Sequence, residues 1–257
     1  MEVNKFTAEL CGIILGDGHM HKTANSITIA GGIDDLLYFQ QRVIPLFRKC
    51  FPNVNPRIHR LKRKQAYHLI VENKAIFHFF LSHFGLKRGR KDDAHIPGIV
   101  VSNPTLTPHF VRGLFDTDGC FKFSKQHKTY AYYPRIRFAF MDSPLAHELQ
   151  ILLSKIGFIP RKSVRPNHGY VTDKNLAQYE ISGQNALERW MRIVKPANPV
   201  QVTKYLFWKK YGYHVQYMTL SDRLSWINGQ TIGPGGFEPP SMGVFSFRLP
   251  KPTILGR

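Results

Sequence analysis

The sequence predicts an α/β protein made of two similar halves, each with an antiparallel sheet. The chain has 257 residues, enough for two small domains with their own cores. A short phrase occurs twice, as LCGIILGDG at residues 10–18 and VRGLFDTDG at residues 111–119. Each copy is followed by the same order of helix and strand patterns. We therefore expect an internal duplication, with Asp17 and Asp118 at equivalent positions 101 residues apart.

In the first half, an apolar helix carries the phrase, and alternating or β-branched residues then indicate strands. The expected elements after the phrase are a strand at 25–32, a helix at 34–51, a strand pair at 56–64 and 66–73, and a helix at 74–86.

The second half repeats this order. The expected elements are a strand at 135–142, a helix at 142–158, a strand pair at 160–167 and 177–183, a helix at 185–194 and an additional helix at 198–212. Asp142 or Ser143 is expected to cap the first of these helices, and Gly157 to end it. An antiparallel sheet covered by helices on one face leaves its other face open.

Composition restricts the class of protein. The chain has 36 Lys and Arg residues and 17 Asp and Glu residues, which gives a formal net charge of +19. Such a charge favours a polyanionic partner, and nucleic acid is the leading candidate. A hydrophobic content of 43% indicates a folded chain. Three dispersed cysteines without a CxxC spacing favour a reducing compartment. We expect no membrane span and no secretion signal, and hence an intracellular protein.

Basic side chains lie on the predicted strands of both halves. Two equivalent basic sheets favour a long groove for double-stranded DNA, whose major groove admits a pair of strands. For any one of these residues, the alternative is a solvated charge. The candidate DNA-binding residues are Arg57, His59, Arg60, Lys62, Lys64, Lys122, Lys125, Arg135, Arg137, Arg161, Lys162 and Arg165.

Small residues in the phrase predict close packing of its two helices. Residues four apart share a helix face, and small side chains at that spacing let two backbones approach. Glycine inside a helix costs about 0.5–1 kcal/mol relative to alanine, so close approach is a plausible compensation. The candidate interface residues are Gly12, Gly16, Gly113 and Thr117. Gly18 and Gly119 suit the helix exits.

The two acids stand at helix C-termini, where the helix dipole disfavours an anion. If the helices pack about a pseudo-twofold axis, Asp17 and Asp118 meet near its centre and repel unless cations lie between them. Oxygen ligands in that arrangement suit Mg²⁺, and such an ion can activate water against a phosphodiester. The alternative is that both phrases are only turns into the following strands.

At these residues the chain resembles the LAGLIDADG homing endonucleases in their single-chain, two-motif form, over roughly residues 4–215. The resemblance implies two pseudo-symmetric αββαββα halves with saddle-like sheets along DNA, and site-specific double-strand cleavage. It also implies that Asp17 and Asp118 bind two or more divalent ions, and Mg²⁺ is the expected ion. Gly16 and Thr117, beside these acids, are further candidates for the metal site. Leu15 departs from the motif, whose earlier acid the second copy keeps as Asp116.

The family also has a lysine near its active centre, just after the last helix of a half. Lys91 and Lys195 match that location, and each could instead be a phosphate contact or a solvated charge. The resemblance implies a monomer that needs no protein partner. The alternative functions are an intron RNA maturase or DNA-binding regulator without cleavage, and a basic RNA-binding protein. The paired acids favour the enzyme, because a pure binder does not need them.

The chain divides into halves at residues 1–97 and 98–227 and a tail at 228–257, where Gly and Pro predict flexibility. The tail contains Gly-Phe-Glu-Pro-Pro at 236–240, which the T-arm of a tRNA gene can encode. We hypothesise that the reading frame runs into such a gene in a prokaryotic genome, with an archaeon as the favoured host.

Overall fold

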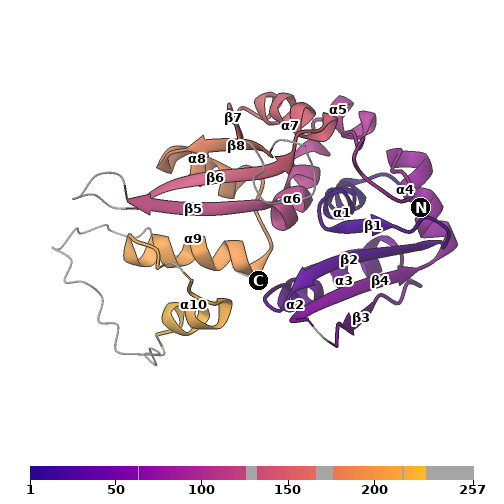
Figure 1. Ribbon diagram of the computed structural model, residues 1–257, viewed down its shortest axis with the longest axis horizontal. Helices are drawn as coiled ribbons and strands as arrows, with labels where there is room; N and C mark the ends of the chain where they lie inside the picture. Colours follow the sequence, from indigo (N-terminus) through magenta and orange to yellow (C-terminus); the bar gives the residue numbers. More distant parts are fainter. Residues whose placement is uncertain (63, 126–131, 166–175, 216, 230–257) are drawn as a thin grey trace, which may run out of the picture.

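The computed structural model describes residues 1–62, 64–125, 132–165, 176–215 and 217–229 (Figure 1). The tail expected at 228–257 lies outside the described residues from position 230 onward. Within the described parts, the order of helix, strand pair, helix, strand pair and helix occurs once in each half, as the sequence predicted. No helix in these parts is long and apolar enough to cross a membrane.

The first half follows the predicted elements with one interruption. Its elements are α1 (Lys5–Leu15), β1 (Gly18–Met20), β2 (Ser26–Gly32), α2 (Asp35–Tyr38), η1 (Phe39–Val43), α3 (Ile44–Cys50), β3 (Arg57–Arg60), β4 (Ala66–Glu72) and α4 (Lys74–Phe84). The sequence predicted one regular helix over 34–51, but η1 is a π-helical turn. Tyr38, Phe39 and Val43 are all buried around this wider turn, and Arg42 within it reaches the buried Glu9.

The second half contains two helices that the sequence did not predict, α5 and α10. Its elements are α5 (Gly98–Ser102), α6 (Thr107–Asp118), β5 (Gly119–Lys125), β6 (Tyr132–Met141), α7 (Pro144–Lys155), β7 (Arg161–Arg165), β8 (Leu176–Ser182), α8 (Gln184–Ile193), α9 (Pro199–Tyr211) and α10 (Leu220–Ile227). Ser143, not Asp142, caps α7. A capping box of Thr219 and Asp222 opens α10, a local signal that was readable in the sequence.

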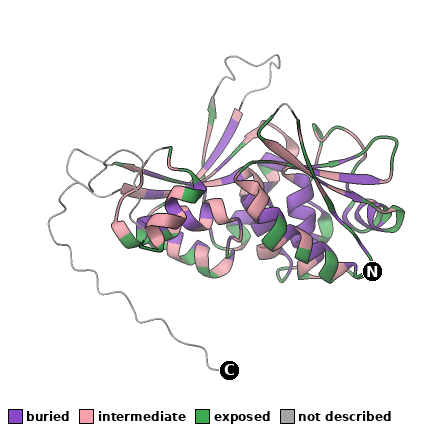
Figure 2. Cartoon of the chain, turned by 90° about the horizontal axis from the view of Figure 1, so that it is seen from below, coloured by how far each residue is buried: buried purple, intermediate pink, exposed green. Residues whose placement is uncertain are grey.

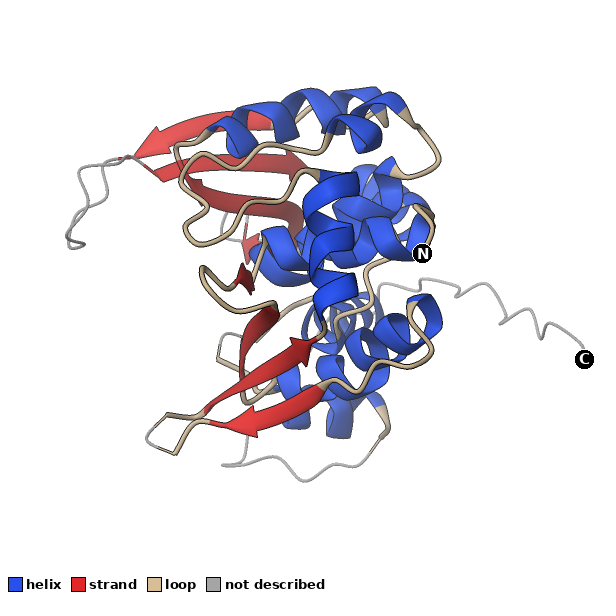
Figure 3. Cartoon of the chain, turned by 90° about the vertical axis from the view of Figure 1, so that its right-hand side faces the viewer, coloured by secondary structure: helices blue, strands red, loops and turns tan. Residues whose placement is uncertain are grey.

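The two sheets have the same topology, and this repeats the duplication in three dimensions. Their strand orders are β1-β2-β4-β3 and β5-β6-β8-β7, and every pairing is antiparallel. The register is equivalent as well, since Gly18 pairs with Ile29 and Gly119 pairs with Phe138. The helices gather on one side of the molecule and the strands on the other (Figure 3). Each sheet therefore has one face toward helices and one face left open.

Helices α1 and α6 form the centre of the molecule, where buried residues are concentrated (Figure 2). Their backbones touch reciprocally. A Cβ on Gly12 would lie 2.2 Å from the carbonyl oxygen of Phe110, and a Cβ on Gly113 would lie 2.1 Å from that of Glu9. A Cβ on Gly16 would lie 1.9 Å from Thr117 Oγ1. The predicted close packing of the two helices is therefore present at all four positions.

The glycines after the helices have a different role from the one expected. Gly119 has φ −91°, and neither Gly18 nor Gly119 has the left-handed backbone typical of a helix exit. A Cβ would instead lie 2.5 Å from Ile14 Cα at Gly18 and 2.1 Å from Phe115 Cδ2 at Gly119. These positions require glycine because the first strand of each sheet turns back tightly against its own helix.

Replacing Gly113 by alanine is expected to lower the free energy of unfolding by about 1–3 kcal/mol or more, because the new methyl group meets backbone that cannot move aside. Urea unfolding followed by circular dichroism measures the change. Gly98→Ala is the matched control, since a Cβ there has no neighbour within 4 Å. Equal stability of the two variants would contradict the packing described here.

Candidate active site and nucleic-acid interface

The packing of α1 on α6 brings the two acids of the repeated phrase together. Asp17 follows the end of α1, and Asp118 is the last residue of α6. An Oδ atom of Asp118 lies 2.9 Å from where a Cβ on Gly16 would stand, beside Asp17. Within the described residues, neither carboxylate accepts a hydrogen bond or forms a close ion pair. Two half-buried carboxylates therefore lie close together without hydrogen-bond donors of their own.

This environment raises the pKa of both acids. Burial is the main cause at Asp118, followed by the charge of Asp17, and the pKa rises to about 7. At Asp17, burial and then the charge of Asp35 raise the pKa to about 6, against a smaller opposing effect of Lys91. Asp35 was not predicted from the sequence. Its carboxylate accepts hydrogen bonds from the Gly32 backbone N–H at 2.8 Å and from Asn198 Nδ2 at 3.2 Å.

The raised pKa values predict a pH-dependent stability in the absence of divalent ions. Between the ordinary aspartate pKa of 3.8 and about 7, the folded chain holds a proton at Asp118 that the unfolded chain has lost. The contribution of this group to the free energy of unfolding therefore falls as pH rises through that interval. Asp118→Asn is expected to be more stable than the parent chain at pH 8, with the difference shrinking toward pH 5. Urea titrations in EDTA at several pH values measure this, and a pH-independent difference would contradict it.

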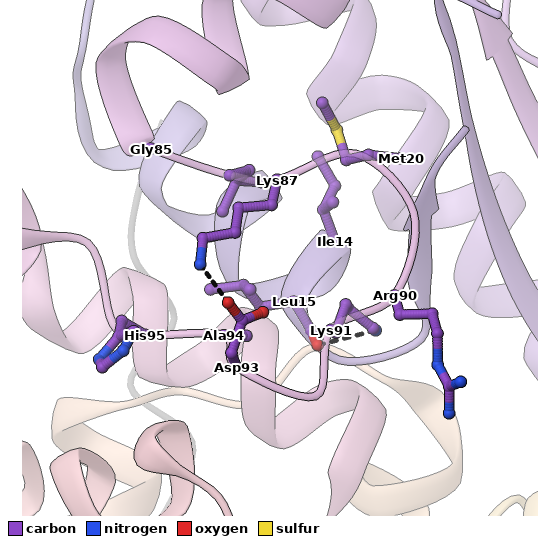
Figure 4. Close-up of a pocket in the computed structure, with 11 residues that line it drawn as sticks. Ile14, Leu15, Met20, Gly85, Lys87, Arg90, Lys91, Asp93, Ala94 and His95 are labelled. Carbon is purple, nitrogen blue, oxygen red and sulfur yellow. Dashed lines mark hydrogen bonds and ion pairs between the residues drawn. The ribbon is translucent and has the colours of Figure 1, made fainter. Parts of the chain in front are cut away.

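Lys91 is the one predicted lysine that the structure places near the two acids, and its side chain reaches the end of α1 (Figure 4). Its Nζ donates to the carbonyl oxygen of Leu15 at 2.9 Å and to that of Gly16. Burial lowers the pKa of Lys91, whereas the charges of Asp118 and Asp17 raise it. The segment carrying it is tied to the first half, since the Gly89 N–H donates to the Met20 carbonyl at 2.8 Å. A cavity of about 120 Å³ is lined by this segment together with Ile14, Leu15 and Met20.

Lys195 does not reach the centre. In the second half, Asn198 makes the contact that is equivalent to the one Lys91 makes in the first half. Lys195 is exposed, with φ 53°, and neither aspartate has it among the charges acting on its pKa. Asn198 Nδ2 donates to the carbonyl oxygen of Asp116 at 2.8 Å. Because Asp116 is equivalent to Leu15, the second half places a neutral amide where the first half places an ammonium group.

Asp116, the earlier acid of the second motif, has a structural environment. It is fully buried, and its two carboxylate oxygens accept the backbone N–H of Ala197 at 3.1 and 2.9 Å. Burial nevertheless raises the pKa of Asp116 to about 7. The acid therefore holds the segment between α8 and α9 against α6, which is how Asn198 is positioned.

A buried ion network, also missed by the sequence analysis, joins the two halves near this centre. The Glu9 side chain is fully buried and accepts Arg42 Nε at 2.6 Å, Arg42 Nη2 at 2.5 Å and Arg112 Nη1 at 3.0 Å. Arg112 Nε donates to the Val194 carbonyl oxygen at 2.7 Å. One carboxylate thus links α1, η1, α6 and the end of α8.

The donor set at the centre fits a hard divalent cation. Asp17 and Asp118 offer carboxylate oxygens with no competing hydrogen-bond donors. A bound cation would lower the raised pKa of both acids. Thr117 Oγ1 donates to the carbonyl oxygens of Gly113 and Leu114 in its own helix, each at 3.1 Å. Among the described residues, no group of three or more His, Cys, Asp or Glu side chains is arranged so that it could hold a metal ion. Water or phosphate oxygens would have to complete the coordination.

The basic residues of the strands divide between the two faces of each sheet, because alternate positions point in opposite directions. The open-face positions, identified by their pairing with non-core partners, are Arg57, His59, Lys122, Arg135, Arg137 and Arg161. Arg165 shares their register, but its side chain is not among those described. Lys62 and Lys64 are exposed in the turn between β3 and β4.

Three candidates were assigned to the wrong face. Arg60 pairs with Tyr67 and shares the helix-facing register of Ile58, and Lys125 shares that of Phe123. Lys162 also points toward α7, where its Nζ lies 3.2 Å from His147 Nδ1 and 3.8 Å from Asp142. The sequence shows strand residues but not their register, and a shift of one residue exchanges the faces.

An acid also lies among the open-face arginines of the second sheet. Glu180 accepts Arg137 Nη2 at 3.1 Å and pairs with Arg135 Nε at 3.3 Å. Arg161 is its cross-strand neighbour. Glu180 therefore fixes the positions of two arginines on this face.

Two antiparallel sheets of equal strand order, joined through two glycine-bearing helices with acids at their ends, define the fold of the LAGLIDADG homing endonucleases. Residues 108–194, within the second half, match the family model described as a LAGLIDADG-like domain. The resemblance carried by the two motifs is thereby confirmed for the fold.

Solved structures agree across most of the chain. The LAGLIDADG homing endonuclease I-GzeII in complex with its DNA target is similar with a TM-score of 0.51 and 12% identity, covering 82% of this chain and 90% of that one. I-DmoI in complex with DNA and Mn is similar with a TM-score of 0.50 and 18% identity, covering 75% of this chain and 97% of that one. At these identities the likeness establishes the fold.

A curated relative is the replication factor C small subunit of Methanocaldococcus jannaschii. It is 26% identical over 213 residues, which cover 77% of this chain. The match covers only 11% of that protein, so this chain is similar to about a tenth of its length.

Proposed function

We propose that the chain is a site-specific endonuclease that hydrolyses phosphodiester bonds of double-stranded DNA with Mg²⁺, using two or more divalent ions. The observation that carries the proposal is the pair of donor-free carboxylates, Asp17 and Asp118, between two sheets with basic open faces. The fold supports it, since I-GzeII and I-DmoI were solved with DNA, and I-DmoI also with Mn. One chain contains both acids, which favours action as a monomer, with halves at 1–97 and 98–227.

Each residue at the centre has a role that follows from its contacts. Asp17 and Asp118 would hold the divalent ions, which when bound supply positive charge for the attacking water and the phosphodiester. Gly16 and Thr117 would contribute through their carbonyl oxygens. Lys91 keeps an ammonium group beside both acids, where it can stabilise charge that develops on the leaving oxygen. These contacts favour Lys91 over Lys195 as the catalytic lysine.

The open faces would hold the DNA backbone and bases. Replacing Arg161 by glutamine is expected to weaken binding to duplex DNA and to reduce the slope of log K against log salt by about 1. Lys162→Gln is the matched control on the same strand, because that side chain points toward α7. Fluorescence polarisation at several salt concentrations measures both slopes. An equal loss in the two variants would contradict the face assignment.

The proposed activity is tested on DNA spanning the gene's own locus with the gene removed. The parent chain and the double variant Asp17→Asn/Asp118→Asn are incubated with this DNA and Mg²⁺, and the ends are mapped by sequencing. A break at one position, made by the parent and not by the variant, is the expected result. Tight binding to the locus without cleavage in Mg²⁺ or Mn²⁺ would reject the endonuclease and favour a maturase or regulator.

A further inference from the structure

A second cavity lies away from the paired acids, at the edge of the second sheet. It has a volume of about 440 Å³ and is lined by residues of β5, α9 and α10, with Asp34 from the first half. Helix α9 runs beside the edge strand β5, and α10 lies beyond it (Figure 1). In the first half the described elements end with α4, so α9 and α10 have no counterpart there. The cavity thus has no counterpart in the first half, although Asp34 of that half contributes to its lining.

The walls of this cavity carry an excess of positive charge. Lys122, Lys204 and Arg223 line it, whereas Asp34 is its one acid. Within the described residues, none of the three cations is in an ion pair within 4.0 Å. Asp34 acts on both Lys204 and Arg223 but leaves an excess of positive charge at the site, and a bound anion would offset that excess.

Arg223 is held in place as a preformed donor. Arg223 is buried, with only 2% of its surface exposed. The Nε donates to Thr203 Oγ1 at 3.0 Å, and Nη1 donates to the Met218 carbonyl oxygen. Lys204 follows Thr203 on α9, and its Nζ makes no hydrogen bond with a described residue. Burial lowers the pKa of Lys204.

A histidine offers a further unused donor. The His214 ring stacks on Phe123, with centroids 5.5 Å apart and planes 20° apart. Its Nε2 is buried and has no hydrogen-bond partner among the described residues. Burial, together with the charges of Lys204 and Arg223, lowers the pKa of His214 to about 4. The ring is therefore neutral at pH 7, and its Nε2–H tautomer could donate to an anion.

We propose that this cavity binds a phosphate group of the DNA backbone, outside the tract of DNA that lies along the two sheets. This inference rests on the proposed function. Lys122 connects the two regions, because it lines the cavity and also pairs with Arg135 on the open face of β5 and β6. A strand of DNA crossing that face would pass the cavity, and Lys204, Arg223 and His214 would receive its phosphate.

The first test is the salt dependence of binding to a duplex of about 30 base pairs. Lys204→Gln is expected to reduce the slope of log K against log salt by about 1. Lys209→Gln on the same helix removes the same charge outside the cavity, where Lys209 pairs with Glu188, and is expected to keep the parent slope. If the parent binds DNA and Lys204→Gln keeps its slope, the inference is wrong while the proposed function stands.

The second test reports on the cavity directly. NMR signals of ¹³C-labelled histidine, assigned with His214→Gln, are followed on adding the same duplex or inorganic pyrophosphate. The His214 signal is expected to move with both additions in the parent chain and in Lys209→Gln, but not in Lys204→Gln. Movement with pyrophosphate alone would reject the DNA backbone as the ligand and indicate a free phosphate compound. No movement with either would reject the site. A chain that neither binds nor cuts DNA would instead reject the proposed function.

Discussion

Replacing either Asp17 or Asp118 by asparagine is expected to reduce DNA cleavage by about 1,000-fold or more, while binding of the target persists. Asparagine keeps the size of the side chain but removes one of the two charges that would hold the divalent ions. Loss of the transition-state stabilisation that a metal ion supplies, several kcal/mol, corresponds to a rate loss of this order. Conversion of supercoiled plasmid carrying the target measures the rate under single-turnover conditions.

Binding must be measured alongside cleavage, because a folding defect would lower both. Fluorescence polarisation in Ca²⁺ or EDTA provides this measurement. Glu2→Gln, which removes an exposed charge at the N-terminus, is the control and is expected to cut at the parent rate. Either aspartate variant cutting as fast as Glu2→Gln would remove the paired carboxylates from the active site.

Glu9→Gln is expected to lower the free energy of unfolding by about 3–5 kcal/mol, the largest stability effect that we predict. The substitution leaves Arg42 and Arg112 without the carboxylate that both contact. Their charges then remain near or within the interior with only the neutral amide as a partner. Because Glu9 joins elements of both halves, cleavage is expected to fall as well, through displacement of Asp17 relative to Asp118.

An exposed pair of similar composition provides the comparison. Glu72→Gln breaks the ion pair with Arg57, in which both side chains are more than half exposed, and is expected to cost less than about 1 kcal/mol. Urea unfolding of both variants measures the difference. A loss in Glu9→Gln no greater than that in Glu72→Gln would mean that the network does not join the halves energetically.

The parts of the centre that the sequence predicted are those encoded locally. Asp17 and Asp118 were found because each lies at the same place in a short phrase that recurs. The interface glycines were found because residues four apart, such as Gly12 and Gly16, share one helix face. Asp35, Asn198 and Glu9 carry no such signal. Asn198 meets Asp35 across 163 positions of sequence, and Glu9 meets Arg112 across 103. Their contacts exist only once the two halves have packed together.

The sequence also could not show which strand residues lie on the open faces, because that depends on the strand register. The basic residues of β3, β5 and β7 were visible in the sequence, but Arg60, Lys125 and Lys162 point to the helix side. The alternation of a strand identifies two sets of side chains without saying which set is covered. Where charged residues occupy both sets, as in Arg161 and Lys162, only the cross-strand partners decide.

The connection between the halves is itself part of the centre, because Lys91 lies in the stretch between α4 and α5. The equivalent stretch after α8 ends in Asn198 and leads into α9. The two copies have therefore diverged into complementary roles and are no longer exchangeable modules. A homodimer assembled from the first copy would bring two ammonium groups to its axis, and one assembled from the second would bring none. Separating the gene into its two repeats would thus change the chemistry of the centre, even if each product folded.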